Sequence, residues 1–274
     1  MIRRLVKNLT LLEPTDAPDE SAQLERDGYA RLRGVFDPTE VARMRQEIDA
    51  TFDATAAERV RDDKDEFRYE MFNRGAGCQA AIMHPEILRV VEPLLGEDCH
   101  VIANTAWRNP PEFPGGVWHC DAGPHVPRPE GVPWDDRIPY PVFAVATHVY
   151  LQDCTRADGP TAVVPGSHRS GRLAPFDKMN AEDLSYDGRP PELFEVEAGD
   201  VALFVSDAWH RGFPAGPGSR GRYFLQVHYA RRDIAQRIRT TAEVNHLSPE
   251  AVARATTDRA RTLVGLHAPF FYDA

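Results

Sequence analysis

The segment Trp118-His119-Cys120-Asp121 contains two side chains that commonly bind metal ions. In an extended strand, residues i and i+2 face the same side, so we expect His119 and Asp121 to project into one space. His210, at the end of the strand-like segment VALFVSDAWH, offers a third donor. One carboxylate and two imidazoles are the donors of the facial triad that binds iron(II), and zinc also accepts such donors.

His-x-Asp alone is a weak motif, because His and Asp side chains are mostly solvent-exposed in proteins. The spacing strengthens it, since His210 lies 91 residues after His119, with several strand-like segments between them. Such a separation fits ligands on opposite sheets of a jelly roll. Arg220 and Arg222 follow His210 by ten and twelve residues. An arginine on that next strand could clamp a dicarboxylate through two parallel hydrogen bonds.

The elements that must position these residues are short strands that begin after residue 99. Five segments have strand length and β-branched or aromatic content: HVIANTAW, VFAVATHVYLQ, TAVVPGSH, ELFEVEAGDVALFVSDAWH and RYFLQVHYARR. Short strands without intervening helices indicate a sandwich or barrel rather than a parallel α/β sheet. Residues 123–141, with six prolines, predict a long loop of the kind that forms functional lids.

The regions around this β-rich core predict helices. Helical patterns cover 21–28, 37–52 and 84–96, with a strand-like YARLRGVF after the first of them, and 246–266 is helical from its Ser-Pro-Glu start. The densely charged residues 53–70 predict a solvated helix end or a mobile segment. We therefore predict one mainly β domain over 1–274, with helical support at about 20–98, a jelly-roll core at about 99–232 and a helical extension at 233–274.

Composition excludes several classes of function. The 274 residues contain 42 acidic and 32 basic side chains, a net charge of −10, which argues against binding to nucleic acid. The four cysteines show no C-x-x-C spacing, so we expect reduced thiols in a cytosol. No export signal or membrane span is expected, so we expect a cytoplasmic location and a small-molecule substrate as the partner.

Four segments occur in the order found in a known family: WHCD, LQDCTRADGPTAVVPGSHRSG, AGDVALFVSDAWHRG and RYFLQVHYARR. With DGYARLRGVFDPTEVARMR before them, the match runs from about residue 20 over nearly the whole chain. The chain resembles the phytanoyl-CoA dioxygenase-like (PhyH) oxygenases. The resemblance implies a double-stranded β-helix, a cupin-like jelly roll, with His119, Asp121 and His210 as iron ligands. It also implies Fe(II), 2-oxoglutarate and O2 as cofactors.

The resemblance favours Arg222 over Arg220 as the clamp for 2-oxoglutarate, because the family's arginine lies shortly before an aromatic strand with a His-Tyr-Ala-like end. The spacing from the distal histidine is slightly longer here than is usual, so Arg220 remains the alternative. Asn104 and His148 match positions that line the cosubstrate pocket. The family often has Ser or Thr where this chain has Gly212, so one hydrogen bond to the cosubstrate is expected to be missing.

Four further residues outside the triad have two interpretations each. His168, in Pro-Gly-Ser-His, is expected to be structural in a tight turn, and His228 is expected to be a hydrogen-bonded core histidine rather than a ligand. His125 and Trp134, in the proline-rich loop, are candidates for substrate contact, with ordinary loop anchoring as the alternative. The substrate pocket is expected to form from the N-terminal helices, residues 67–79 and this loop.

The resemblance implies hydroxylation of an unactivated C–H bond in a small metabolite or natural-product intermediate, with conversion of 2-oxoglutarate to succinate and CO2. Asp121 argues for oxygenation, because related iron halogenases have Gly or Ala at that position. Desaturation, epimerisation or ring formation by the same cofactors is the first alternative. A cupin-like protein that holds a metal without turnover is the second, and an arginine clamp behind the triad argues against it.

Overall fold

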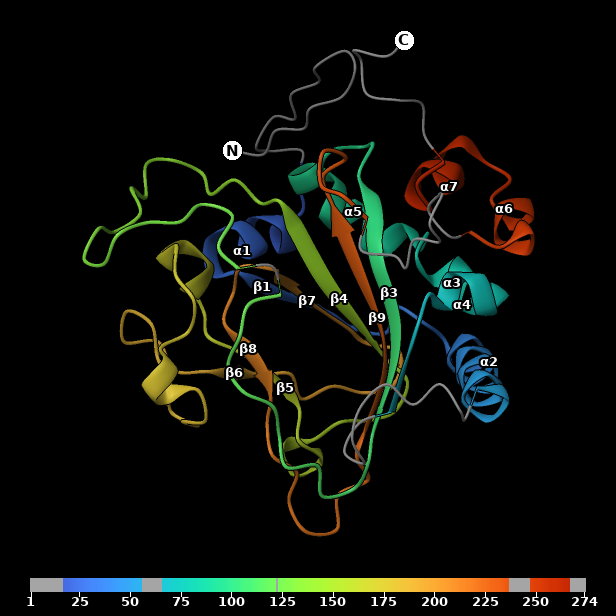
Figure 1. The fold of residues 1–274 in the computed structure, drawn as a ribbon, viewed down its shortest axis with the longest axis horizontal. Helices are drawn as coiled ribbons and strands as arrows, with labels where there is room; N and C mark the ends of the chain where they lie inside the picture. Colours follow the sequence, from blue (N-terminus) through green and yellow to red (C-terminus); the bar gives the residue numbers. More distant parts are fainter. Residues whose placement is uncertain (1–16, 56–65, 122, 237–246, 267–274) are drawn as a thin grey trace.

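Two antiparallel sheets form the core of the computed structural model, which describes residues 17–55, 66–121, 123–236 and 247–266 (Figure 1). The larger sheet has the order β1-β7-β4-β9-β3-β2, and the smaller has the order β6-β5-β8. The strands are β1 (Tyr29–Leu32), β2 (Glu66–Tyr69), β3 (His100–Asn109), β4 (Ala144–Tyr150), β5 (Thr161–Val163), β6 (Glu192–Leu193), β7 (Val201–Val205), β8 (His210–Gly212) and β9 (Arg222–Ala230).

The two sheets enclose an aromatic interior. Side chains of β4, β7 and β9 on one face of the larger sheet pack against β5 and the chain around β6. This cluster includes Tyr150, Val163, Phe194, Phe204 and Phe224, all buried. Because side chains alternate along a strand, the even-numbered residues of β9 face this interior and the odd-numbered ones face outward. The arrangement is the predicted jelly roll, mainly β with flanking helices.

Helices cover the outer face of the larger sheet. They are α1 (Asp19–Asp27), α2 (Pro38–Ala54), α3 (Met71–Arg74), α4 (Ala76–Ala81), α5 (Pro85–Leu95), α6 (Pro249–Arg254) and α7 (Asp258–Leu263), with short 3-10 turns at η3 (Arg156–Asp158), η4 (Ser167–Ser170) and η5 (Phe176–Lys178). Asp37 begins α2 by accepting hydrogen bonds from the backbone of Thr39 and Glu40, and the Glu40 side chain accepts one from Asp37 N. The predicted helix at 37–52 therefore forms where a capping signal precedes apolar spacing.

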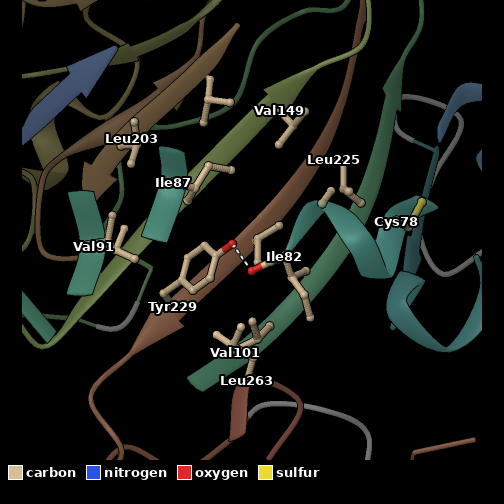
Figure 2. Close-up of a cluster of buried hydrophobic side chains, with 14 of the residues drawn as sticks. Cys78, Ile82, Ile87, Val91, Val101, Val149, Leu203, Leu225, Tyr229 and Leu263 are labelled. Atoms are coloured by element: carbon tan, nitrogen blue, oxygen red, sulfur yellow. Dashed lines mark hydrogen bonds between the residues drawn. The ribbon is translucent and has the colours of Figure 1, made fainter. Parts of the chain in front are cut away.

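The outer face of the sheet and the helices share the largest hydrophobic core (Figure 2). Val149, Leu203 and Leu225 come from three neighbouring strands, while Ile82 and Ile87 come from the helical side. In the same region, the Tyr229 hydroxyl donates a hydrogen bond of 2.9 Å to the carbonyl of Ile82. This core fixes the orientation of β9, whose other face carries residues of the candidate site.

Two expectations about the flanking regions need correction. Residues 66–69, expected to be solvated or mobile, form β2, which pairs with β3 at the edge of the larger sheet. Residues 56–65 of that charged segment lie outside the described residues. The C-terminal helical pattern is divided into α6 and α7, because the chain leaves the helix at Ala255 and Thr257 caps a new one.

The remaining composition-based expectations concern cysteines and membranes. All four cysteines are free thiols in the structure. Within the described ranges, no helix has the length and apolar character needed to cross a lipid bilayer.

We predict that Tyr229→Phe lowers the free energy of unfolding by about 1–3 kcal/mol, because it leaves the buried Ile82 carbonyl without its donor. Urea denaturation followed by circular dichroism measures the change. The matched control is Tyr69→Phe, at a side chain that is 52% exposed, which should change stability by less than about 0.5 kcal/mol. Equal stability of Y229F and the wild type would contradict the prediction.

Candidate active site

The first feature of the site is a short pairing between two distant parts of the chain. His119 and His210 form an isolated antiparallel bridge, in which each backbone N–H donates to the carbonyl of the other at 3.0 Å. Two residues after His119, Asp121 N–H donates to the carbonyl of Ser206 at 3.1 Å. These bonds place the His-x-Asp segment beside β8 and the end of β7, so three side chains meet at the edge of the interior.

The three predicted donors lie within reach of one ion. One ligand atom from each of His119, Asp121 and His210 lies within 4.8 Å of the others, and no other such group occurs in the part of the chain that the structure describes. Asp121 Oδ1 is 3.5 Å from His210 Nε2 and 3.9 Å from His119 Nε2. His210 is buried, whereas the side chain of His119 is 48% exposed. The site therefore opens to solvent on the side of His119.

The hydrogen bonds of the two imidazoles identify which nitrogens carry protons. Nδ1 of His119 lies 2.8 Å from the Val117 carbonyl, and Nδ1 of His210 lies 2.9 Å from the Ala208 carbonyl. A carbonyl oxygen only accepts, so both Nδ1 atoms are donors, and Nε2 of each ring is left on the side of Asp121. This arrangement is typical of histidines that bind metals.

Electrostatics keep this donor set ready for a cation. Desolvation of its ring and the nearby His210 lower the pKa of His119 to about 4, so this imidazole is neutral at pH 7. Burial opposes ionisation of Asp121, but His210 and His228 outweigh it and hold the pKa of Asp121 well below its usual range. Burial likewise lowers the pKa of His210, and the Asp121 carboxylate raises it by more, so the net shift is upward. Asp121 thus favours a positive charge at this point, whether a proton on His210 or a bound cation.

His228, on the inner face of β9, lies next to the triad without belonging to it. Its Nε2 is 3.4 Å from Asp121 Oδ2 and 2.9 Å from Gln226 Nε2. Gln226 in turn accepts a hydrogen bond from the indole of Trp107. His228 therefore sits in a hydrogen-bonded chain of polar side chains, in line with its expected core role.

Arg222, the first residue of β9, is buried on the same inner face. Its guanidinium donates to Asn109 Oδ1 at 3.1 Å and to Thr161 Oγ1 at 2.8 Å. Arg220 instead lies at the surface, 56% exposed, 3.4 Å from Asp158. Of the two candidates for the clamp, only Arg222 reaches the interior.

Gly212 leaves room for this guanidinium. A Cβ at position 212 would lie 2.6 Å from Nη2 of Arg222, so a side chain there would displace the arginine. Thr161 lies directly opposite Gly212 in the pairing of β5 with β8, and its hydroxyl binds the guanidinium. Position 212 therefore carries no hydroxyl, but Thr161 on the facing strand places one beside it.

His148, on β4, connects the arginine with the metal donors. Its Nδ1 lies 3.3 Å from Thr161 Oγ1, and its ring packs against Phe204, which also contacts the ring of His210. Burial, Arg222 and His210 hold the pKa of His148 well below its ordinary value, so the ring is neutral. Its buried Nε2 has no hydrogen-bond partner among the described residues. A polar ligand atom in this pocket would satisfy it.

The expectation for Asn104 is wrong in the structure. Asn104 pairs with Val227 on the outer face of the larger sheet, where its amide oxygen accepts from Phe72 N–H and its nitrogen donates to the Gln226 carbonyl. A bulge between Val101 and Ala103 sets which residues of β3 face inward. Asn104 thus fastens a helix to the sheet and does not line the interior.

The proline-rich loop 123–141 contains no helix or strand and extends on the left in Figure 1. The indole of Trp134 donates to the Ile138 carbonyl and packs against Tyr140, so this ring anchors the loop. His125 binds the buried Asp207 through both its backbone N–H and its ring. His168, in η4, is buried with Nε2 3.0 Å from the Glu25 carbonyl, which agrees with its expected structural role.

Sequence reasoning missed three residues that hold the site together: Thr161, Asn109 and Asp207. Thr161 and Asn109 could have been found only from the strand pairing that brings them to Arg222, because they lie 61 and 113 residues away in the sequence. Asp207 had a weak signal, since Ser-Asp at the end of an apolar strand and three residues before His210 places a carboxylate near the triad.

A jelly roll with two imidazoles and one carboxylate at its open edge, backed by a buried arginine, defines a site of the facial-triad class. The family model for phytanoyl-CoA dioxygenase (PhyH) matches residues 24–221. The chain therefore belongs to the PhyH family and is a 2-oxoglutarate-dependent non-heme iron enzyme, with Fe(II), 2-oxoglutarate and O2 as cofactors. Membership in an enzyme family argues against the second alternative, a cupin-like protein that binds a metal without turnover.

Solved structures share the fold at low sequence identity. The carbocyclase SnoK from nogalamycin biosynthesis aligns with a TM-score of 0.59 and 18% identity over 79% of this chain and 85% of its own. The epimerase SnoN from the same biosynthesis aligns with a TM-score of 0.58 and 20% identity, over 80% of this chain and 84% of its own. HygX from Streptomyces hygroscopicus was solved with nickel, 2-oxoglutarate and hygromycin B bound. It aligns with a TM-score of 0.61 and 16% identity, over 84% of this chain and 94% of its own. At these identities, the likeness shows the fold alone.

We predict that divalent metal binding releases about one proton near pH 6, below the ordinary pKa of histidine, and fewer once the pH passes the raised pKa of His210, because the metal displaces the proton that Asp121 stabilises there. Apparent affinity should therefore rise with pH up to the raised pKa of His210 and then level off. Titration calorimetry with Mn(II), in two buffers of different ionisation enthalpy, measures the protons released. A proton count that does not change with pH would contradict the prediction.

Proposed function

We propose that this enzyme hydroxylates an unactivated C–H bond of a small metabolite or natural-product intermediate, converting 2-oxoglutarate to succinate and CO2. The observation that carries the proposal is the convergence of the Nε2 atoms of His119 and His210 with Asp121 Oδ1 on one point, in front of the buried Arg222. An ion at that point would receive three donors and keep other positions open. A carboxylate at position 121 leaves no ligand position for the halide that a halogenase needs.

The residues of the chain divide the work of holding iron and cosubstrate. His119, Asp121 and His210 would hold the metal, which together with 2-oxoglutarate and O2 supplies the oxidant for the C–H bond. Arg222 would bind the far carboxylate of 2-oxoglutarate, with Asn109 and Thr161 fixing its guanidinium. His148 Nε2 would meet a polar atom of the cosubstrate between the two, because it is otherwise unpaired there.

The accessible side of the site supports a small-molecule substrate. His119 is half exposed, and His125 and Trp134 lie in the loop that follows the His-x-Asp segment. Hygromycin B and nogalamycin RO occur with 2-oxoglutarate in solved proteins of the same fold, HygX and SnoN. These compounds are natural products, which supports a substrate of that class for this chain.

Epimerisation or ring formation is the second candidate. The names of SnoN and SnoK, an epimerase and a carbocyclase, indicate that this fold accommodates both outcomes. Hydroxylation and these reactions differ in how the substrate lies against the metal, so product analysis by mass spectrometry distinguishes them. A product heavier by one oxygen atom supports hydroxylation, and a product of equal mass supports epimerisation.

We predict that Asp121→Ala abolishes succinate formation from 2-oxoglutarate, because only two donors remain and no carboxylate balances the charge of the metal. Anaerobic titration with Fe(II) and 2-oxoglutarate, followed by visible absorption, gives a second readout through the metal-to-cosubstrate charge-transfer band. The control is Asp153→Ala, at a surface carboxylate 55% exposed. Full activity in D121A would refute the assignment of the metal site.

We predict that Arg222→Gln raises the KM for 2-oxoglutarate by roughly 10- to 100-fold, the loss expected when a charged hydrogen bond to a carboxylate is removed. Arg220→Gln is the matched control, because Arg220 is exposed and pairs with Asp158. Its KM should stay within about twofold of the wild type. The reverse result, with R220Q impaired and R222Q normal, would reassign the clamp.

A further inference from the structure

Asp207 connects the loop 123–141 with the candidate metal centre. Its backbone carbonyl accepts a hydrogen bond from Cys120 Sγ at 3.3 Å, and its neighbour Ser206 accepts from Asp121 N–H. The carbonyl of Ala208, on its other side, accepts from Nδ1 of His210. The segment that carries Asp207 is therefore the same segment that holds two of the metal donors.

The buried Asp207 carboxylate receives three hydrogen bonds from the loop. Oδ2 accepts from His125 N–H at 3.0 Å and from the Tyr140 hydroxyl at 2.7 Å, and Oδ1 contacts Nδ1 of His125. Its side chain is 2% exposed. Burial and Asp207 raise the pKa of Tyr140 far above its usual range, so the phenol keeps its proton and donates it. The cluster thus satisfies a carboxylate away from water.

The state of the His125 ring follows from this contact. A carboxylate oxygen accepts, so Nδ1 is the nitrogen that donates to Asp207, and Nε2 is the nitrogen left to exchange a proton with another group. Nε2 forms no hydrogen bond with any described residue, and the side chain is 17% exposed. The ring is held flat against Phe143, with centroids 4.9 Å apart and planes 8° apart. His125 is therefore a fixed imidazole with one nitrogen free to accept a proton.

The position of the ring is set by three strand ends. Phe143 precedes β4, Asp207 follows β7 by two residues, and the Phe143 carbonyl accepts from Arg231, which follows β9. Asp121 and His228 face each other at this same end of the barrel, whereas Arg222 lies at the opposite end of β9. His125 thus lies at the end of the larger sheet where Asp121 and His228 meet, the end away from the proposed cosubstrate clamp.

We propose that His125, oriented by Asp207 and Tyr140, is a catalytic base that accepts a proton from an O–H group of the substrate. The inference rests on the proposed function and extends it to the substrate class, a molecule with a hydroxyl group beside the carbon that is oxidised. The Nε2 lone pair forms the new N–H bond, and the O–H bond breaks with its electron pair left on oxygen. Asp207 balances the charge of the imidazolium that results.

Nuclear magnetic resonance of protein with 15N-labelled histidine tests the tautomer and the position of His125 without any substrate. We expect a protonated Nδ1 and an unprotonated Nε2 at neutral pH. Mn(II) bound at the triad should broaden the His125 ring signals relative to Zn(II), while those of His84, at the start of α5, should not change. An Nε2–H tautomer, or His125 signals that Mn(II) leaves sharp while those of His119 and His210 disappear, would overturn the proposal.

Failure of the proposed function gives a different result in the same spectra, because Mn(II) would then leave the signals of His119 and His210 sharp as well.

Asp207→Asn replaces the carboxylate by an amide that can also donate, so the Nε2–H tautomer of His125 should become populated. A tautomer unchanged in folded D207N would contradict the role given to Asp207. If that variant does not fold, the wild-type tautomer still decides.

The kinetic test uses His125→Ala and the hydroxylated compound that most stimulates succinate release by the wild type. General-base catalysis predicts a fall of about 10²- to 10⁴-fold in the stimulated rate. Added imidazole should restore part of it by occupying the space on Phe143, and it should restore nothing in D121A. A rate in H125A that equals the wild type, or a loss that imidazole does not reduce, would refute the base and leave the oxygenase assignment intact.

Discussion

The backbone pairing of His119 with His210 is the interaction on which the site depends. It joins a loop segment to the smaller sheet, and the bond from Asp121 N–H to Ser206 continues it toward the larger sheet. Together these bonds hold one carboxylate between two imidazoles, where it favours a positive charge on His210 or on a bound ion. The two sheets and the helices behind them serve to keep this contact in register.

Strand alternation explains what could be predicted from the sequence. Arg222 is assigned through the resemblance to the PhyH family, whereas the period of two and the His-x-Asp spacing direct His119 and Asp121 into one space. These are local rules, so they need no knowledge of the partner strand. Asn104 shows the limit, because a bulge two residues earlier decides which face a residue of β3 occupies, and no residue pattern reveals that bulge.

The parts that escaped prediction are side-chain contacts between distant segments. Arg222 is fixed by Asn109 and Thr161, and the role of Gly212 is visible only as the space that the guanidinium fills. Such contacts depend on which strands pair and on the direction of each side chain. The resemblance of the chain to the PhyH family indicates that a hydroxyl is missing two residues after His210. Only the structure shows that Thr161, on the facing strand, carries a hydroxyl beside that position.

The proline-rich loop leaves the site at His125 and returns at Tyr140, and both residues bind the same carboxylate, Asp207. Between these two points the loop is held further, because Arg128 N–H donates to the Gly171 carbonyl and Asp136 pairs with Arg169. Changes in this span that keep those contacts would therefore alter the surface near the site without moving the metal donors. For an engineer, the exposed side chains of the span, such as Val132 and Ile138, are the positions to vary.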